Sequence, residues 1–167
     1  SGVPVALPWR TVTVAAPTTV RIEFVPAPAP AGASAEVLAK AAQTVVLKEK
    51  TTLQAGEILD ATFMSKKALG AFYAQQIAKA KKDGVLFSLH LKATMMKVSD
   101  PIIFGHVVRA FLPDVFAAYG ADLAAAGLSA NNGLGSIIEG LGALGDKGAE
   151  IKAAIDRGLA DGPRLAM

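Results

Sequence analysis

The chain contains no cysteine, and this excludes disulfide bonds and any mechanism that needs a thiolate. A cysteine-free sequence fits a reducing compartment, so we expect a cytoplasmic protein. No continuous apolar stretch approaches the roughly 18 residues that a membrane-spanning helix requires. Residues 1–10 also lack the basic and apolar segments of a signal peptide, and we expect no membrane association.

A large excess of one charge is also missing. The 17 basic and 14 acidic residues are spread along the chain and give a net charge of +3. Surfaces that bind nucleic acid concentrate lysine and arginine in patches, so we expect no nucleic-acid partner. The alternative is a local basic groove that binds a small anion. With 167 residues, 52% of them hydrophobic, the chain can bury a core, and we expect residues 1–167 to form a single domain or subdomain.

Strand patterns occupy the first part of the chain. A Pro/Ala-rich segment over residues 26–43 interrupts them and should form an extended loop, with one helical turn over residues 36–42. Alternation of apolar and polar residues predicts strands over residues 11–14, 18–25, 45–50 and 57–63.

Helical spacing dominates the rest of the chain. Ser65 is an N-cap candidate for a helix that Gly84 ends. Pro101 and Pro113 favour two further helix starts, because proline lacks the N–H group that a first turn leaves unpaired. Two short helices should follow, over residues 134–144 and 149–159. This order predicts an α/β or α+β fold, with a mixed β-sheet, flanking helices and a helical C-terminal part.

The most informative segment leads from a predicted strand into a helix. Residues 85–91 are mostly apolar, which predicts an interior strand covered on both faces. Lys92 follows this strand, at the edge of a sheet where α/β folds usually place chemistry. Burial lowers the pKa of a lysine toward the range useful for proton transfer, so Lys92 is a candidate catalytic residue. The alternative is a solvated lysine at the end of a strand.

The neighbours of Lys92 have simpler interpretations. Lys97 could steer anionic carboxylates or merely solvate its loop. We interpret Ser99 and Asp100 as helix caps that hold the loop in shape. The two histidines, His90 and His106, lie sixteen residues apart and match no zinc motif, so structural roles are favoured for both.

Motifs for a cofactor or a metal are absent from the sequence. Acidic residues occur singly, and Gly133-Leu134-Gly135 lacks the third glycine of a nucleotide-binding loop, so we interpret it as a turn. Met95 and Met96 are interpreted as core residues. We assign no cofactor-binding and no metal-binding residue to this chain.

Several short motifs resemble those of the monomeric, NADP-dependent isocitrate dehydrogenases. The most specific is His90-Leu91-Lys92-Ala93-Thr94-Met95-Met96, which Lys97-Val98-Ser99-Asp100-Pro101 follows directly. The similarity extends from about Val20 to Met167. The first ten residues match poorly, and the Pro/Ala-rich loop is longer than that of the family. Further segments that carry the resemblance are residues 47–51, 64–69, 131–135 and 162–167.

The resemblance implies a monomeric two-domain enzyme of the tricarboxylic acid cycle, of which this chain would be a segment of the large central domain. That family oxidises isocitrate with NADP and decarboxylates the product to 2-oxoglutarate, with Mg²⁺ or Mn²⁺ as a Lewis acid. Lys92 stands at the position of the family's substrate-contacting, proton-transferring lysine, and Lys97 is a weaker candidate for substrate binding.

The same resemblance places the metal-binding aspartates and the NADP site outside this segment. We therefore expect the isolated chain to hold neither cofactor and to be inactive. Its partners would be isocitrate, 2-oxoglutarate and the remainder of the same polypeptide. The alternative is a non-catalytic binding or scaffold module derived from the same fold.

Overall fold

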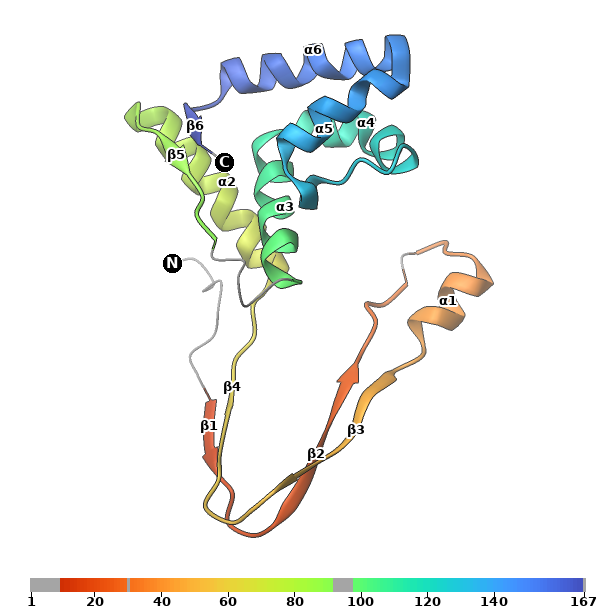
Figure 1. Cartoon of the computed structure of the whole chain (residues 1–167), viewed down its shortest axis with the longest axis vertical. Coiled ribbons are helices and arrows are strands. Elements are labelled where there is room, and N and C mark those ends of the chain that lie inside the picture. Colours follow the sequence, from red (N-terminus) through yellow and green to blue (C-terminus); the bar gives the residue numbers. More distant parts are fainter. Residues whose placement is uncertain (1–9, 30, 92–97, 167) are drawn as a thin grey trace. The chain divides into compact units, whose positions relative to one another are not determined.

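The computed structural model describes residues 10–29, 31–91 and 98–166, and these form two compact units. The N-terminal unit comprises described residues up to 63, and the C-terminal unit comprises those from 64 onward. Figure 1 shows the strands of the first unit and the helices of the second. Lys92 and Lys97, which the sequence singles out, lie outside the described residues.

The N-terminal unit is built from two antiparallel strand pairs. Figure 1 shows β2 and β3 running side by side, and α1 lies in the connection between them. Two register shifts between Val20 and Glu23 interrupt the β2–β3 ladder. The predicted strands and the helical turn are confirmed. The elements are β1 (Arg10–Thr13), which pairs with β4 (Ile58–Ala61), β2 (Thr18–Phe24), which pairs with β3 (Val45–Leu53), and α1 (Ala35–Ala41).

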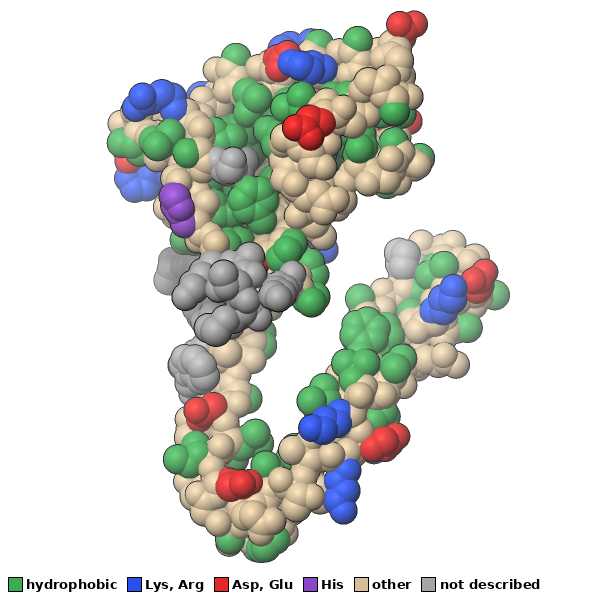
Figure 2. All heavy atoms as spheres, in the orientation of Figure 1, with side chains coloured by type: hydrophobic (Ala, Val, Ile, Leu, Met, Phe, Trp, Pro, Cys, Tyr) green, Lys and Arg blue, Asp and Glu red, His purple; other side chains and the backbone are tan. Residues whose placement is uncertain are grey.

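Apolar side chains of the β2–β3 ribbon are open to solvent in this chain. Ile22 and Phe24 on β2 and Leu47 on β3 are between 51% and 65% exposed, and Figure 2 shows hydrophobic side chains along the ribbon. Among the described residues of this unit, Val14 alone is buried. A two-stranded ribbon is marginally stable at best in water, so its own two strands supply little of its stability.

The C-terminal unit is mainly helical. Its first helix, α2 (Lys66–Asp83), begins where the Ser65 hydroxyl accepts a hydrogen bond of 3.2 Å from the Ala68 N–H group, which confirms the predicted N-cap. A helix also begins at Pro113, as predicted. The remaining elements are α3 (Ser99–Phe111), α4 (Pro113–Ala125), α5 (Leu134–Gly140) and α6 (Gly145–Asp161), the 3₁₀ turns η1 (Ala130–Asn132) and η2 (Leu141–Leu144), and the strands β5 (Phe87–Ser88) and β6 (Leu165–Ala166).

One apolar cluster holds α3, α4, α5 and α6 together. Val108 of α3 and Ile151 of α6 are fully buried in it, together with Leu123 and Ile137. The long helix α6 contacts both α4 and η2. This close packing uses Gly148, because a Cβ atom there would lie 2.0 Å from the Leu141 carbonyl oxygen. Burial of such side chains supplies most of the driving force for this packing.

A second, smaller cluster joins α2 to α3. It consists of Leu69 and Tyr73 from α2 and Val107 from α3. Val107 and Val108 are adjacent in sequence and both are 0% exposed, yet they belong to different clusters. Helix α3 is therefore held from two sides.

The predicted interior strand over residues 85–91 is wrong in length and in burial. Only Phe87 and Ser88 form strand β5, and Val85 and Leu86 are each 51% exposed. The reason lies in the end of α2, where the Val85 N–H group donates a hydrogen bond to the Ala80 carbonyl. This bond belongs to a helix C-terminal motif that keeps residue 85 out of the strand.

The α+β fold class is confirmed, but the strands do not form one mixed sheet. The described strands form three two-stranded sheets, two of them antiparallel. The third pairs β5 with β6 in parallel, so within the described residues β5 has a neighbour on one side only.

Candidate functional site

The motif that points to chemistry lies where β5 ends and α3 begins. The described residues on either side of Lys92 and Lys97 border a recess of about 390 Å³. The turn at η1 completes its wall, so three separate stretches of sequence meet there. We call this the strand-end recess, and it is lined by Leu89, His90, Leu91, Asp100, Pro101, Phe104, Asn131, Asn132 and Gly133.

Asp100 is the acidic side chain of the strand-end recess. It is the second residue of α3, and it is 8% exposed. No hydrogen bond or ion pair joins its carboxylate to another residue within the described ranges. A negative charge in the first turn of a helix interacts favourably with the helix dipole, which offsets part of the cost of burial.

The prediction that Ser99 and Asp100 cap α3 is wrong. The N-cap position is Val98, whose backbone is already helical, and no side chain makes a capping hydrogen bond there. The helix therefore begins two residues before Pro101, although proline is still within its first turn. As a result, Asp100 lines the recess and does not close the helix end.

His90 is held by its neighbours on the strand. Its Nε2 atom lies 2.8 Å from the Ser88 hydroxyl oxygen, and that hydroxyl also donates to the Ala166 carbonyl at 3.2 Å. A serine hydroxyl has one hydrogen, so the contact with His90 requires Nε2–H as the donor. This arrangement ties the end of β5 to β6, and the structural role of His90 stays a prediction.

The opposite wall of the recess depends on a close contact between α3 and η1. A Cβ atom on Gly105 would lie 2.0 Å from Oδ1 of Asn131 and 3.0 Å from its backbone nitrogen. Asn131 therefore fills the space that a side chain at position 105 would take. The sequence identified Asn131-Asn132-Gly133 as a turn but gave no role to its amides. The sequence signal that could have revealed this contact is Gly105, a glycine among the apolar residues of a predicted helix.

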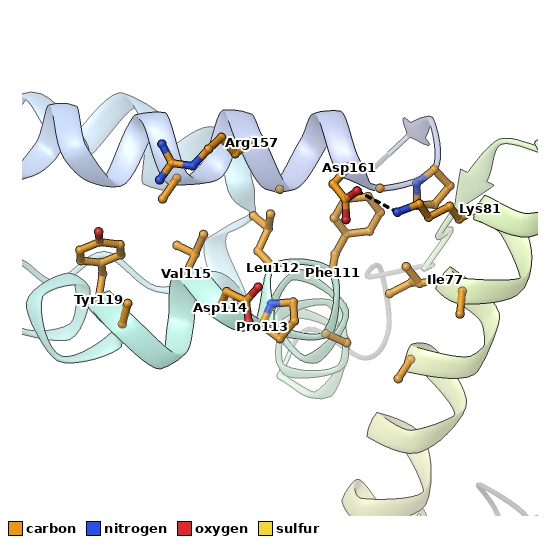
Figure 3. Close-up of a pocket in the computed structure, with 18 residues that line it drawn as sticks. Ile77, Lys81, Phe111, Leu112, Pro113, Asp114, Val115, Tyr119, Arg157 and Asp161 are labelled. Atoms are coloured by element: carbon orange, nitrogen blue, oxygen red, sulfur yellow. Dashed lines mark hydrogen bonds and ion pairs between the residues drawn. The ribbon is translucent and has the colours of Figure 1, made fainter.

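A larger groove, of about 620 Å³, lies elsewhere in the same unit. Figure 3 shows Leu112 and Val115 on its apolar floor, with Lys81 and Asp161 paired at its edge by an ion pair of 2.9 Å. Both charged side chains of that pair are about half exposed or more. No described residue of the lysine motif lines this groove, so we place the candidate site at the strand-end recess.

Metal-binding clusters and membrane spans were sought in the same part of the chain. Within residues 10–29, 31–91 and 98–166, no three acidic or histidine side chains are grouped so that they could hold a metal ion. No helix within those ranges is both long and apolar enough to span a bilayer.

Comparison with known proteins identifies the family. The model of the family described as monomeric isocitrate dehydrogenase matches residues 22–167. The chain belongs to this family. The match covers the central lysine motif and every residue that lines the strand-end recess.

Individual relatives of this monomeric isocitrate dehydrogenase segment agree with the family match. "Isocitrate dehydrogenase [NADP]" of Corynebacterium glutamicum is 62% identical over 122 residues, which are 73% of this chain and 16% of that protein. The protein of the same name from Azotobacter vinelandii is 47% identical over 83% of this chain and 19% of its own length. "Isocitrate dehydrogenase [NADP] 2" of Mycobacterium tuberculosis is 45% identical over 79% of this chain, which corresponds to 18% of that protein. The chain thus spans less than a fifth of these relatives.

The Gly105–Asn131 contact yields a prediction about stability. Replacing Gly105 with Ala should lower the free energy of unfolding of the 167-residue chain by about 1–3 kcal/mol, because the new methyl group overlaps Asn131. Urea denaturation followed by circular dichroism measures the change. Gly120→Ala is the matched control, since a Cβ there meets nothing within 4 Å and alanine favours a helix interior. Equal effects of the two substitutions would refute the assigned contact.

His106 yields a prediction about pH. This half-buried residue lies on α3, and its pKa is lowered first by burial and then by the charges of Lys66 and Arg109. The unfolded chain therefore binds a proton at His106 more readily than the folded chain does. As pH falls from about 7.5 to about 5.5, past the ordinary histidine pKa of about 6.5, the melting temperature of the wild type should fall further than that of His106→Gln. Parallel melting curves would contradict the assignment.

Proposed function

We propose that this chain is a segment of an NADP-dependent isocitrate dehydrogenase that converts isocitrate to 2-oxoglutarate. The observation that carries the proposal is the family match over residues 22–167, together with relatives that bear this enzyme's name. The whole protein's activity is inferred from those relatives, because the chain spans only 16% to 19% of the length of the three described above.

Lys92 is the residue to which we assign a catalytic role. It follows directly on Leu91, which lines the strand-end recess. An ammonium group at this position can donate a proton to the oxygen that changes between hydroxyl and enolate, and recover it afterwards. Lys97, five residues further on, would steer the substrate carboxylates by charge. The first turn of α3 adds a favourable dipole for an anion, which the charge of Asp100 opposes.

The cofactors of the parent enzyme would be bound mainly outside this segment. NADP accepts a hydride in this chemistry, and Mg²⁺ or Mn²⁺ stabilises negative charge on the substrate oxygen. The side chains that the structure describes do not fit the metal, since they contain no cluster of three acidic or histidine ligands. We therefore assign no step of the metal chemistry to this segment.

Finer features of the proposal follow from the sequence. A cysteine-free chain supports a cytoplasmic enzyme, and the family resemblance supports a monomer of the tricarboxylic acid cycle. The chain would form part of the large central domain, with the remainder of the same polypeptide as its partner. The open apolar side chains of the β2–β3 ribbon support such a partner.

The assignment of Lys92 is tested by substitution in the full-length enzyme. Lys92→Met should lower kcat by at least about a hundredfold, since positioned acid–base groups contribute about 10²–10⁴-fold to rates. Lys97→Met should raise KM for isocitrate more than it lowers kcat, if this residue only attracts the anion. Steady-state kinetics with each variant measures both parameters.

Circular dichroism of both variants serves as the folding control for this experiment. A folded Lys92→Met enzyme with nearly normal kcat would remove the only catalytic residue assigned here. A Lys97→Met enzyme that loses kcat as severely as Lys92→Met would show that the two roles are misassigned.

The isolated 167-residue chain should show no measurable oxidation of isocitrate. Stabilisation of developing charge by a metal ion is usually a large part of catalysis, and we expect the metal ligands and the main nucleotide site to be absent from it. The measurement is NADPH formation at high chain concentration, with full-length enzyme as the positive control. Turnover by a preparation free of longer species would overturn this expectation.

A further inference from the structure

The groove of about 620 Å³ on the C-terminal unit has no part in the proposed chemistry, and the residues that line it are all described. Helices α2, α4 and α6 form its walls, and the end of α3 contributes to its floor. We call it the three-helix groove. Phe111, Leu112 and Val115 on the floor are buried in the main apolar cluster. Because close-packed interiors resist rearrangement, this floor keeps the groove open in the folded unit.

The exposed side chains of α4, which forms one wall, are almost all small and apolar. Asp114 is the one charged residue among the exposed positions of this helix, and the others are a proline and five alanines. Helices that face water usually carry polar and charged side chains on the outside, whereas a helix that is apolar all round is buried in a larger protein. Of these exposed positions, Pro113 and Ala118 line the groove. The wall that α4 forms is therefore suited to being covered by protein.

Helix α6, which forms the opposite wall, has one side with the character of a solvated surface and one without it. Lys152 and Asp156 form an ion pair of 2.9 Å at i and i+4, as is usual on a helix face in contact with water. Ala154 and Gly158, on the opposite side of the helix, line the groove. Two facing walls of the groove thus carry small apolar residues.

The charged side chains at the rim determine which polar groups an occupant needs. Lys81 and Asp161 already form an ion pair with each other. Arg157 on α6 and Asp114 on α4 are exposed at the two sides of the groove, and Figure 3 shows Leu112 between them. An occupant with an apolar face, an acidic side chain toward α6 and a basic one toward α4 would complement the groove.

Two observations indicate that the occupant belongs to the same polypeptide. The chain spans only 16% to 19% of the three relatives described above, so most of a protein of that length lies outside this chain. The family that matches is described as monomeric, which disfavours a second copy as the cover. A helix is the element that fits, because small side chains on the walls allow helices to approach within the usual interaxial distance of about 8–10 Å.

We propose that the three-helix groove is the docking site for an amphipathic helix from a part of the same polypeptide outside this chain. The helix would place apolar residues at i, i+3 or i+4 and i+7 against Leu112 and Val115, with an acidic residue beside Arg157. The inference rests on the proposed function, which makes this chain a segment of a longer enzyme. It gives the remainder of the polypeptide a contact on the C-terminal unit, in addition to the β2–β3 ribbon of the N-terminal unit.

The test is thiol labelling of the folded full-length enzyme at two alanines that are both exposed in this chain. Ala118 lines the groove, whereas Ala160 lies outside it, four residues after Asp156 on α6. Ala118→Cys and Ala160→Cys are each treated with N-ethylmaleimide. The modified peptide is quantified by mass spectrometry, so that cysteines elsewhere in the enzyme do not interfere. Each rate is divided by the rate of the same variant in urea.

In the folded enzyme, the normalised rate of Ala118→Cys should be at least about fivefold lower than that of Ala160→Cys, because a docked helix must open before the reagent reaches the groove. The control thiol should react without such an opening step. A difference below about fivefold overturns the proposal, since the groove would then be open to solvent in the whole enzyme.

Photo-crosslinking identifies the occupant. Arg157, at the rim, is replaced by p-benzoylphenylalanine in the full-length enzyme, and the cross-linked peptides are identified by mass spectrometry after irradiation. The expected product joins position 157 to an amphipathic helical segment outside this chain, within one polypeptide. A product that joins two polypeptides, or one that contains only residues of this chain, overturns the proposal.

Turnover of isocitrate with NADP⁺ by the unsubstituted full-length enzyme is measured alongside. An enzyme without turnover defeats the proposed function, and the ratio of labelling rates still decides whether the groove is covered. An enzyme that turns over while Ala118→Cys and Ala160→Cys react alike defeats this inference alone.

Discussion

The adjacent residues Val107 and Val108 impose the constraint on which the C-terminal unit depends. Both are fully buried, but one faces α2 and the other faces the core that α4, α5 and α6 share. A helix anchored on two sides can neither rotate nor slide without opening one of the two clusters, and close-packed interiors resist such changes. The first turn of α3, which carries Asp100, is therefore fixed in space by residues two turns away.

This anchoring explains how a site can form from distant parts of the sequence. The recess has one wall from the end of β5, one from α3 and one from η1, and each of these elements also contacts the core, through Phe87, Val108 and Ala130 respectively. β5 is joined to β6 by two residue pairs, and its Phe87 ring lies 6.3 Å from that of Phe111 on α3. The η1 turn is placed by Asn131 against Gly105. Each wall thus takes its position from the same helix.

The sequence predicted the helical part of this arrangement well, because the signals there are local. Ser65 and Pro113 mark helix starts through backbone hydrogen bonding that depends on a few neighbouring residues. The strand over residues 85–91 was predicted poorly, since its pairing partner lies near residue 165 and local apolar content cannot reveal how many residues will pair. Asp100 was misassigned as a helix cap for a related reason. The helix begins two residues earlier than Pro101 indicated, so Asp100 lies inside the first turn and lines the recess.

The candidate site was predictable in part. Its lysine motif stands out in sequence, and the family match contains it. The amides of Asn131 and Asn132 could not be assigned in the same way. Asn131 lies 32 residues past Ser99, the start of α3, and the close approach of its turn depends on a missing side chain at position 105.

Two of the closely packed glycines of this unit, Gly105 and Gly148, differ in the substitutions that they permit during evolution. At position 148 a side chain would meet the carbonyl oxygen of Leu141, which is backbone and is present whatever residue stands there, so no change at 141 can make room. At position 105 the nearest atom belongs to the side chain of Asn131. A relative with a smaller residue at 131 would gain part of the space that alanine at 105 needs. Position 148 should therefore stay glycine throughout the family, whereas 105 and 131 should vary as a pair.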